Sequence, residues 1–139
     1  GVAVRGARRV PTSVLASVMA SAAAVLLVAC GGGSESSGPP VTGVAAEGQQ
    51  LFRSNGCSGC HSVNGSDGAG PTLAGVAGSQ VRLEDGSTVT ADDAYLRESI
   101  VNPSAKRVDG FTIAMPQREL TDAQVDALIA YLKALPPAS

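Results

Sequence analysis

The sequence predicts a small all-α domain that carries a short β-hairpin. The clearest evidence is residues 121–135, where apolar side chains recur every three or four positions as on one face of a helix. A second helical pattern covers residues 90–101. Between the expected helices, residues 81–89 alternate apolar and polar on both sides of Asp85-Gly86, which is typical of a hairpin. With 139 residues, the chain has the length of one domain.

Residues 1–29 are typical of an export signal, with a basic start followed by an uncharged apolar run over 14–29. The basic residues are Arg5, Arg8 and Arg9. The apolar run is shorter than the roughly 20 residues that a membrane-spanning helix needs. It ends at Leu27-Val28-Ala29-Cys30, which resembles the lipobox of bacterial lipoproteins, so we expect Cys30 to carry a lipid. An ordinary signal peptide in which Cys30 has no role, or an uncleaved signal anchor, remains open.

Residues 30–43 then form a linker after the expected lipidated cysteine, rich in Gly, Ser and Pro. A flexible chain of this length reaches roughly 20 Å on average. We expect it to hold the folded domain, residues 44–139, close to the membrane. A disordered terminus without that role would have the same composition.

The first helix of the domain is expected over residues 45–54, with Leu51 and Phe52 on its apolar side. Gly48 lies one turn before Phe52, and a glycine inside a helix lowers stability by about 1 kcal/mol. We therefore expect another element to cross closely at Gly48. Asn55-Gly56 is a typical helix end.

The remaining helices have recognisable ends. Thr90-Ala91-Asp92-Asp93 looks like a capping box with an acidic third residue, opening a helix that Asn102-Pro103 ends. Thr121 and Gln124 form a second capping box, and the helix that they open stops before Pro136-Pro137. Tyr131 is expected on the flank of its apolar stripe, which consists of Val125, Leu128, Ile129, Leu132 and Leu135.

The residues best suited to bind a metal or cofactor lie in Cys57-Ser58-Gly59-Cys60-His61, which holds two of the three cysteines and the only histidine. This is the pattern for covalent attachment of a c-type haem. If the first helix continues into the motif, the two thiols lie about one turn apart on one face, where each can capture a vinyl group. We expect His61 to bind the iron, and the Gly/Ser-rich residues that follow it to wrap one edge of the porphyrin.

Three other uses of the motif remain open. A structural zinc site needs four protein ligands, and the domain offers only three cysteine and histidine side chains. A thioredoxin-like redox pair favours a preceding strand within a βαβ unit, which this sequence lacks. A local disulfide between Cys57 and Cys60 is the third alternative.

Met115 is the candidate for the second axial position on the iron. The chain has no second histidine, and its other methionine, Met19, lies in the expected leader. The alternative is a core methionine that fills a gap. His/Met ligation raises the reduction potential and leaves the iron without an open site, which favours electron transfer over catalysis.

Several stretches between residues 45 and 135 resemble the class I c-type cytochromes, most narrowly the cytochrome c domain fused to subunit II of bacterial haem-copper oxidases. They are Gly48-Gln49-Gln50-Leu51-Phe52, residues 56–61, residues 70–75, Asp85-Gly86, residues 92–100, Asn102-Pro103, Met115-Pro116 and Ala130-Tyr131-Leu132. The resemblance implies the class I cytochrome c fold, with helices around one haem c.

The resemblance also implies roles for individual residues. Gly48 and Phe52 would cross the last helix against Tyr131. The Pro71 carbonyl would accept a hydrogen bond from the free nitrogen of His61, and Leu73 would pack on the ring. Such support fixes the tautomer and basicity of an axial histidine.

These features together predict a free-standing, lipid-tethered electron carrier of a respiratory chain, not an enzyme. We expect a monomer on the outer side of the cytoplasmic membrane, or on the periplasmic face of an outer membrane. Its donor would be a quinol–cytochrome c reductase or a similar protein, and its acceptor a terminal oxidase or a similar protein. A small haem peroxidase and a non-haem lipoprotein with a thiol pair are the alternatives.

Net charge bears on the partners. Without the three arginines of the leader, seven basic residues face twelve acidic ones from residue 30 onward, a formal balance of about −5. An acidic domain argues against binding nucleic acid. It favours a redox partner with a basic docking face.

Overall fold

The computed structural model describes residues 39–139. In chain order this part holds helix α1 (Gly43–Ser54), the 3₁₀ turn η1 (Cys57–Gly59), strands β1 (Gln80–Arg82) and β2 (Thr88–Thr90), and helices α2 (Asp93–Val101) and α3 (Asp122–Ala134). The expected leader, Cys30 and most of the linker lie outside the described residues. Within residues 39–139, no helix is long and apolar enough to cross a membrane.

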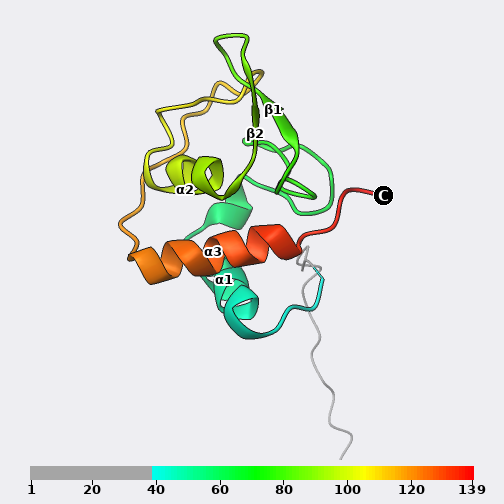
Figure 1. Cartoon of the computed structure of the whole chain (residues 1–139), viewed down its shortest axis with the longest axis vertical. Helices are drawn as coiled ribbons and strands as arrows, with labels where there is room; N and C mark the ends of the chain where they lie inside the picture. Colours follow the sequence, from blue (N-terminus) through cyan, green and yellow to red (C-terminus); the bar gives the residue numbers. More distant parts are fainter. Residues whose placement is uncertain (1–38) are drawn as a thin grey trace, which may run out of the picture. The chain divides into compact units, whose positions relative to one another are not determined.

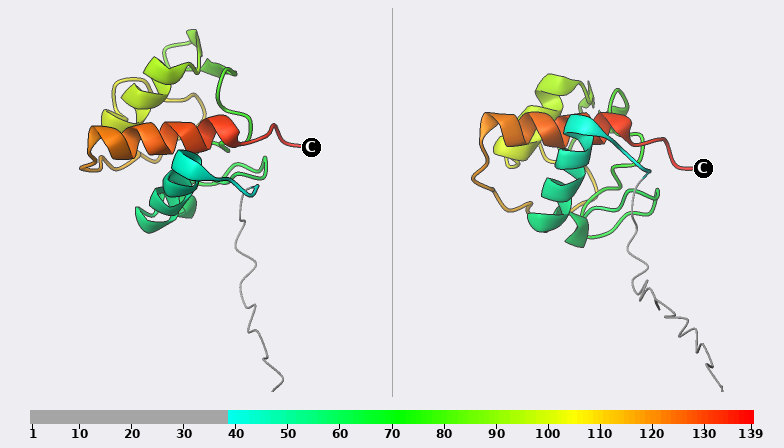
Figure 2. Two further views of the ribbon diagram at one scale, coloured as in Figure 1. Left: turned by 60° about the horizontal axis from the view of Figure 1, so that its bottom comes forward. Right: turned by 90° about the horizontal axis from the view of Figure 1, so that it is seen from below.

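Helix α3 lies between α1 and α2 and packs against both (Figures 1 and 2). Its inward face supplies half of the buried apolar core, because apolar residues at helical spacing all turn to one side. The core side chains that α3 and its C-cap contribute are Val125, Leu128, Ile129, Tyr131, Leu132 and Leu135. The predicted all-α class with a hairpin is therefore confirmed.

The close crossing expected at Gly48 is present between α1 and α3. A Cβ atom on Gly48 would lie 1.9 Å from the Ala127 carbonyl oxygen and 2.8 Å from Tyr131 Cβ. One turn further on, the rings of Phe52 and Tyr131 meet with centroids 5.5 Å apart and planes tilted by 55°. Tyr131 is only 2% exposed, and its contacts with Gly48 and Phe52 are those that the family resemblance implied. Because Gly48 has no side chain, the two helices approach closely enough for Tyr131 to pack in the core.

The cap of α2 differs from the sequence prediction. Asp92, not Thr90, is the N-cap, and its side chain accepts a hydrogen bond of 2.8 Å from the Tyr95 N–H. Thr90 is the last residue of β2 and pairs with Gln80, so its backbone is committed to the sheet. The helix ends at Val101 with Asn102 as C-cap, as predicted. The capping box of Thr121 and Gln124 on α3 is also confirmed.

The hairpin is confirmed, and it is more than an appendage. Strands β1 and β2 pair antiparallel with Val81 opposite Val89. The turn carries Gly86 at φ +84° and Asp85, whose carboxylate accepts from the Ser87 N–H at 2.8 Å. The hydrogen bonds from Ser87 hold the pKa of Asp85 below its ordinary value.

Beyond the strands, the hairpin extends into the long segment that follows α2. Leu83 is buried in the core and forms a bridge with Val108. The Glu84 N–H donates to the Arg107 carbonyl at 3.0 Å. The guanidinium of Arg107 in turn donates to the Phe111 carbonyl at 3.1 Å. The hairpin thus braces the segment that leads to Met115.

Candidate haem site

The Cys57–His61 motif lies on its own 3₁₀ turn and does not continue α1. Asn55 caps α1, and Gly56 at φ +74° redirects the chain. The N–H groups of Cys60 and His61 both donate to the Cys57 carbonyl, at 3.2 Å and 3.0 Å. Residues three apart eclipse each other in a 3₁₀ turn. The helix end predicted at Asn55-Gly56 is therefore confirmed, and the separate, tighter turn brings both cysteines to one side.

Cys57 and Cys60 are free thiols, and both are half-buried. Burial raises the pKa of the Cys57 thiol, while the nearby Arg118 guanidinium acts in the opposite direction. Arg118 Nη2 lies 3.9 Å from the place where a Cβ of Gly56 would stand. Sequence reasoning missed Arg118, because no motif relates it to the cysteines across the intervening residues.

His61 is oriented by the backbone of the loop that follows it. Its Nδ1 lies 2.8 Å from the Pro71 carbonyl oxygen. A carbonyl only accepts, so Nδ1 carries the proton and donates, and the lone pair of the neutral ring is left on Nε2. The contact expected from the family resemblance is present. An unprotonated Nε2 is the form in which histidine binds a metal.

Gly70 makes the approach of the histidine ring possible. It is buried, and a Cβ there would lie 2.6 Å from His61 Cε1. Any larger residue would push the ring away from the Pro71 carbonyl. The Gly70-Pro71 pair in the sequence was a signal for this contact, although the reason for the glycine appears only in three dimensions.

The loop between His61 and β1 is irregular, as predicted, and hydrogen bonds hold it together. Thr72 is the centre of this network. Its hydroxyl accepts from the Gly65 N–H at 3.1 Å and from the Ser62 hydroxyl at 3.0 Å. The Leu73 N–H donates to the Ser62 carbonyl at 2.8 Å. These contacts fix the peptide next to Pro71, and sequence reasoning did not single out Thr72 or Ser62.

Leu73 and Met115 are both half-buried, and within residues 39–139 no hydrogen bond joins their side chains to the motif. Leu73 is half-buried against the core. Met115 is half-buried in the irregular segment between α2 and α3. Gln117 anchors this segment, donating to the Val101 carbonyl at 3.0 Å. Arg118 then brings the residues that follow Met115 beside the motif.

The donor set fits a covalently held haem better than a metal ion alone. Free thiols on one turn, an imidazole with Nε2 available and half-buried apolar neighbours are what the porphyrin requires. Among the described residues, no three His, Cys, Asp or Glu side chains gather as a metal site would require.

In α2, the Ser99 hydroxyl oxygen is buried without a hydrogen-bond partner among the described residues. Such a group calls for a water or a bound acceptor.

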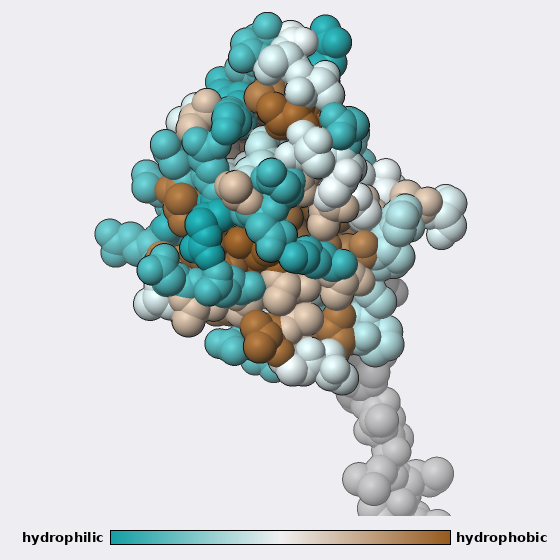
Figure 3. Space-filling model, in the orientation of Figure 1, coloured by the Kyte–Doolittle hydropathy of each residue, from teal (hydrophilic) through white to brown (hydrophobic). Residues whose placement is uncertain are grey.

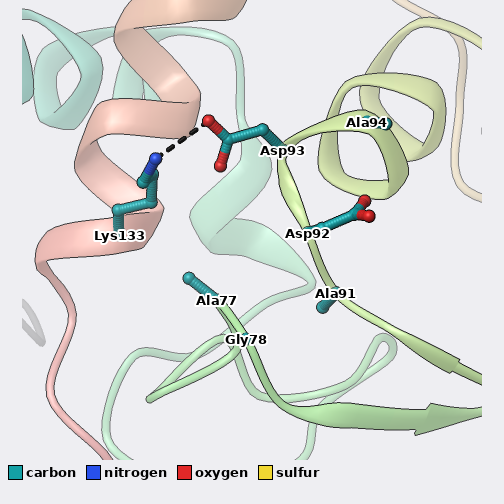
Figure 4. A pocket seen from close by; sticks show the side chains of 7 residues that line it. All are labelled: Ala77, Gly78, Ala91, Asp92, Asp93, Ala94 and Lys133. Atoms are coloured by element: carbon teal, nitrogen blue, oxygen red, sulfur yellow. Dashed lines mark hydrogen bonds and ion pairs between the residues drawn. The ribbon is translucent and has the colours of Figure 1, made fainter.

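One surface hollow lies away from the motif. It has a volume of about 580 Å³ and lies between Gly78, the start of α2 and Lys133, whose ammonium pairs with Asp93 at 2.8 Å (Figure 4). Because this ion pair is exposed to solvent, it contributes little to the free energy of folding. Figure 3, in the orientation of Figure 1, shows many polar residues on the visible face, with apolar residues visible between α2 and α3. The hollow includes no residue of the motif.

Comparison with known proteins identifies the family. The profile of the family Cytochrome c matches residues 45–136. A cytochrome c of Tetrahymena pyriformis is 35% identical over 108 residues, spanning 70% of this chain and 96% of that protein. Cytochrome c2 iso-1 of Magnetospirillum molischianum is 36% identical over 90 residues, spanning 57% of this chain and 89% of that protein.

Two further similarities are more limited. Cytochrome c oxidase subunit 2 of Alkalihalophilus pseudofirmus (strain ATCC BAA-2126 / JCM 17055 / OF4) is 30% identical over 97 residues, spanning 69% of this chain but only 27% of that protein. Among solved structures, cytochrome cH from Methylobacterium extorquens aligns with a TM-score of 0.49 and 32% identity, covering 66% of this chain and 98% of that one. By sequence identity and coverage of the relative, the resemblance to the oxidase subunit is weaker than the resemblance to the two small cytochromes.

The match over residues 45–136 sets aside zinc, a redox thiol pair and a local disulfide as uses of the motif. One haem c is attached covalently through Cys57 and Cys60. Its role is to carry electrons and not to catalyse a reaction. The chain therefore belongs to the cytochrome c family and has the class I cytochrome c fold.

Proposed function

We propose that this protein is a membrane-tethered cytochrome that passes single electrons along a respiratory chain towards a terminal oxidase, with His61 and Met115 as the axial ligands. The observation that carries the proposal is the hydrogen bond from His61 Nδ1 to the Pro71 carbonyl, directly after the two haem-binding cysteines. It leaves Nε2 free to bind iron and fixes the plane of the ring.

The protein fixes the orientation of the His61 imidazole ring. Gly70 packs against the ring, and the Pro71 carbonyl accepts a hydrogen bond from its proton-bearing nitrogen. A ligand held in this way needs little rearrangement when the charge on the metal changes, and the hydrogen bond raises its basicity. Leu73, half-buried within the same loop, would supply an apolar surface for the porphyrin.

Met115 would supply a soft neutral sulfur as the second ligand to the iron. Its segment is anchored at one end by Arg107 and at the other by Gln117. When bound, the haem supplies an iron that alternates between two oxidation states. If His61 and Met115 both held the iron, no position would be left for a substrate or for oxygen, which favours electron transfer over catalysis.

The membrane tether and the partners extend the proposal beyond the folded domain. The apolar run ending at Cys30 supports lipid attachment after export, and the linker gives the domain reach from the membrane surface. The respiratory role and the oxidase acceptor draw support from the similarity to an oxidase subunit. The acidic balance favours partners with basic docking faces.

Optical spectra of the purified holoprotein test the ligand assignment. We expect a c-type α band on reduction, low-spin iron, and a methionine-to-iron charge-transfer band in the oxidised form. A high-spin spectrum would show that Met115 does not bind, and absence of the haem bands would overturn the proposal as a whole.

Fractionation of cells tests the tether. Cys30→Ser should move the protein from the membrane to the soluble fraction, because the lipid acceptor is lost. Cys60→Ser in the same precursor is the control: it impairs haem attachment and leaves the protein in the membrane fraction. Membrane association that persists in a Cys30→Ser protein whose leader has been removed contradicts the lipid anchor, whereas an uncleaved leader would itself hold the protein in the membrane.

A further inference from the structure

The segment that follows α3, residues 136–138, lies along the loop that supports His61. In Figures 1 and 2 it leaves the end of α3 beside the loop between η1 and β1. The contact is made at two glycines of that loop. A Cβ on Gly65 would lie 2.4 Å from Ala138 Cβ, and a Cβ on Gly75 would lie 2.7 Å from Pro137 Cα.

Both glycines have a backbone that other residues rarely adopt, with φ of +96° at Gly65 and +62° at Gly75. Glycine is therefore favoured at each position for two reasons. It tolerates the positive φ, and it leaves the space that Ala138 fills at Gly65 and Pro137 fills at Gly75. Residues 136–138 remain exposed overall, so they touch the loop along one edge only.

The two glycines bracket the part of the loop that reaches His61. The Gly65 N–H donates to the Thr72 hydroxyl at 3.1 Å, and Thr72 follows Pro71 directly. The Pro71 carbonyl accepts from His61 Nδ1. A short path of hydrogen bonds and peptide bonds thus runs from Gly65, which Ala138 faces, through Thr72 and Pro71 to the histidine.

We propose that residues 136–138 form a positioning element, which holds the 62–76 loop and keeps the Pro71 carbonyl beside His61. This inference rests on the proposed role of His61 as an iron ligand. Contact from outside keeps the irregular loop closed, since it has no regular structure of its own to resist opening. Pro137 suits the task because its fixed φ limits the freedom of the segment.

Hydrogen exchange in the holoprotein tests the proposal through a double-mutant cycle. Gly65→Ala places a methyl group against Ala138 and should speed exchange of the Leu73 N–H and the His61 Nδ1 proton by roughly 5- to 30-fold. Adding Ala138→Gly removes the opposing Cβ and should recover most of that change. The strain of a positive φ is the same in both variants, so the difference between them reports only the contact.

A second comparison does not depend on rescue. Gly75→Ala and Gly78→Ala both place alanine at a positive φ, +62° and +79°, but only Gly75 faces the segment, while nothing lies within 4 Å of Gly78. Gly75→Ala should speed exchange of the His61 Nδ1 proton, and Gly78→Ala should leave it unchanged. The Leu132 amide in α3 should exchange at its normal rate in all variants, which separates local opening from global unfolding.

Equal exchange in Gly65→Ala and the double variant, together with equal effects of Gly75→Ala and Gly78→Ala, would overturn the positioning role. The optical spectrum of the unmodified protein tests the proposed function separately. Absence of the c-type haem bands would reject the proposed function, whereas the exchange cycle would still report whether the segment holds the loop.

Discussion

At the scale of single residues, His61 and Met115 differ in how firmly the protein holds them. His61 is fixed by a backbone carbonyl on one nitrogen and by the close approach of Gly70. Met115 makes no side-chain hydrogen bond among residues 39–139, and only its flanking residues are anchored. Under the proposed ligation, the methionine side is therefore the one that opens first.

Replacing Met115 should expose this difference. Met115→Ala should lower the reduction potential, by part of the roughly 0.8 V range that axial ligands control, and remove the charge-transfer band. Added imidazole or azide should then bind the iron. Spectroelectrochemical titration measures the shift. Ile113→Ala is the matched control, since Ile113 lies two residues earlier and is 64% exposed; equal potentials in the two variants would remove Met115 from the site.

At the scale of elements, the crossing of α1 and α3 organises the core. Gly48→Ala would ordinarily favour a helix by about 1 kcal/mol. Here the new methyl group meets the Ala127 carbonyl, and overpacking of this kind costs about 1–3 kcal/mol or more. We expect a net loss of stability, seen as a lower midpoint in denaturant.

The control for that crossing is Gly59→Ala. Gly59 has nothing within 4 Å of its Cβ position and no positive φ, so alanine there should change the midpoint little. An unchanged or higher midpoint for Gly48→Ala would show that the helices do not meet as closely as the structure has them.

The start of α2 allows a second test at this scale. Asp92→Ala removes the hydrogen bond to the Tyr95 N–H and should lower the free energy of unfolding by about 1 kcal/mol. Thr90→Ala, at the cap position that the sequence pattern suggested, should change it by less than about 0.5 kcal/mol, because the Thr90 side chain is exposed. Chemical denaturation distinguishes the two, and the reverse order would restore Thr90 as the cap.

At the scale of the whole molecule, the acidic balance governs encounter with partners. With a formal charge of about −5 from residue 30 onward, electron transfer to a basic redox protein should slow as salt is added. Raising the ionic strength from about 0.01 to 0.15 M shortens the screening length from about 30 to 8 Å. Stopped-flow mixing measures the rate. A small neutral reductant is the control, and a salt-independent rate with the basic partner would contradict the steering role.

Much of this protein was determined by sequence patterns that act locally. The capping box at Thr121, the turn at Asp85-Gly86 and the stop at Asn102 each depend on residues within a few positions of one another. The haem-binding motif is local for the same reason, since two thiols must reach one porphyrin. Such features can be predicted because neighbours in the chain are neighbours in space.

Tertiary structure alone decided the features that join distant segments. The N-cap of α2 is Asp92 and not Thr90, because Thr90 belongs to β2 and pairs with Gln80. Arg118 came to lie beside Gly56, and Pro137 and Ala138 beside the loop that supports His61. These contacts depend on how the helices cross, and that crossing is set by the space that Gly48 leaves open to α3.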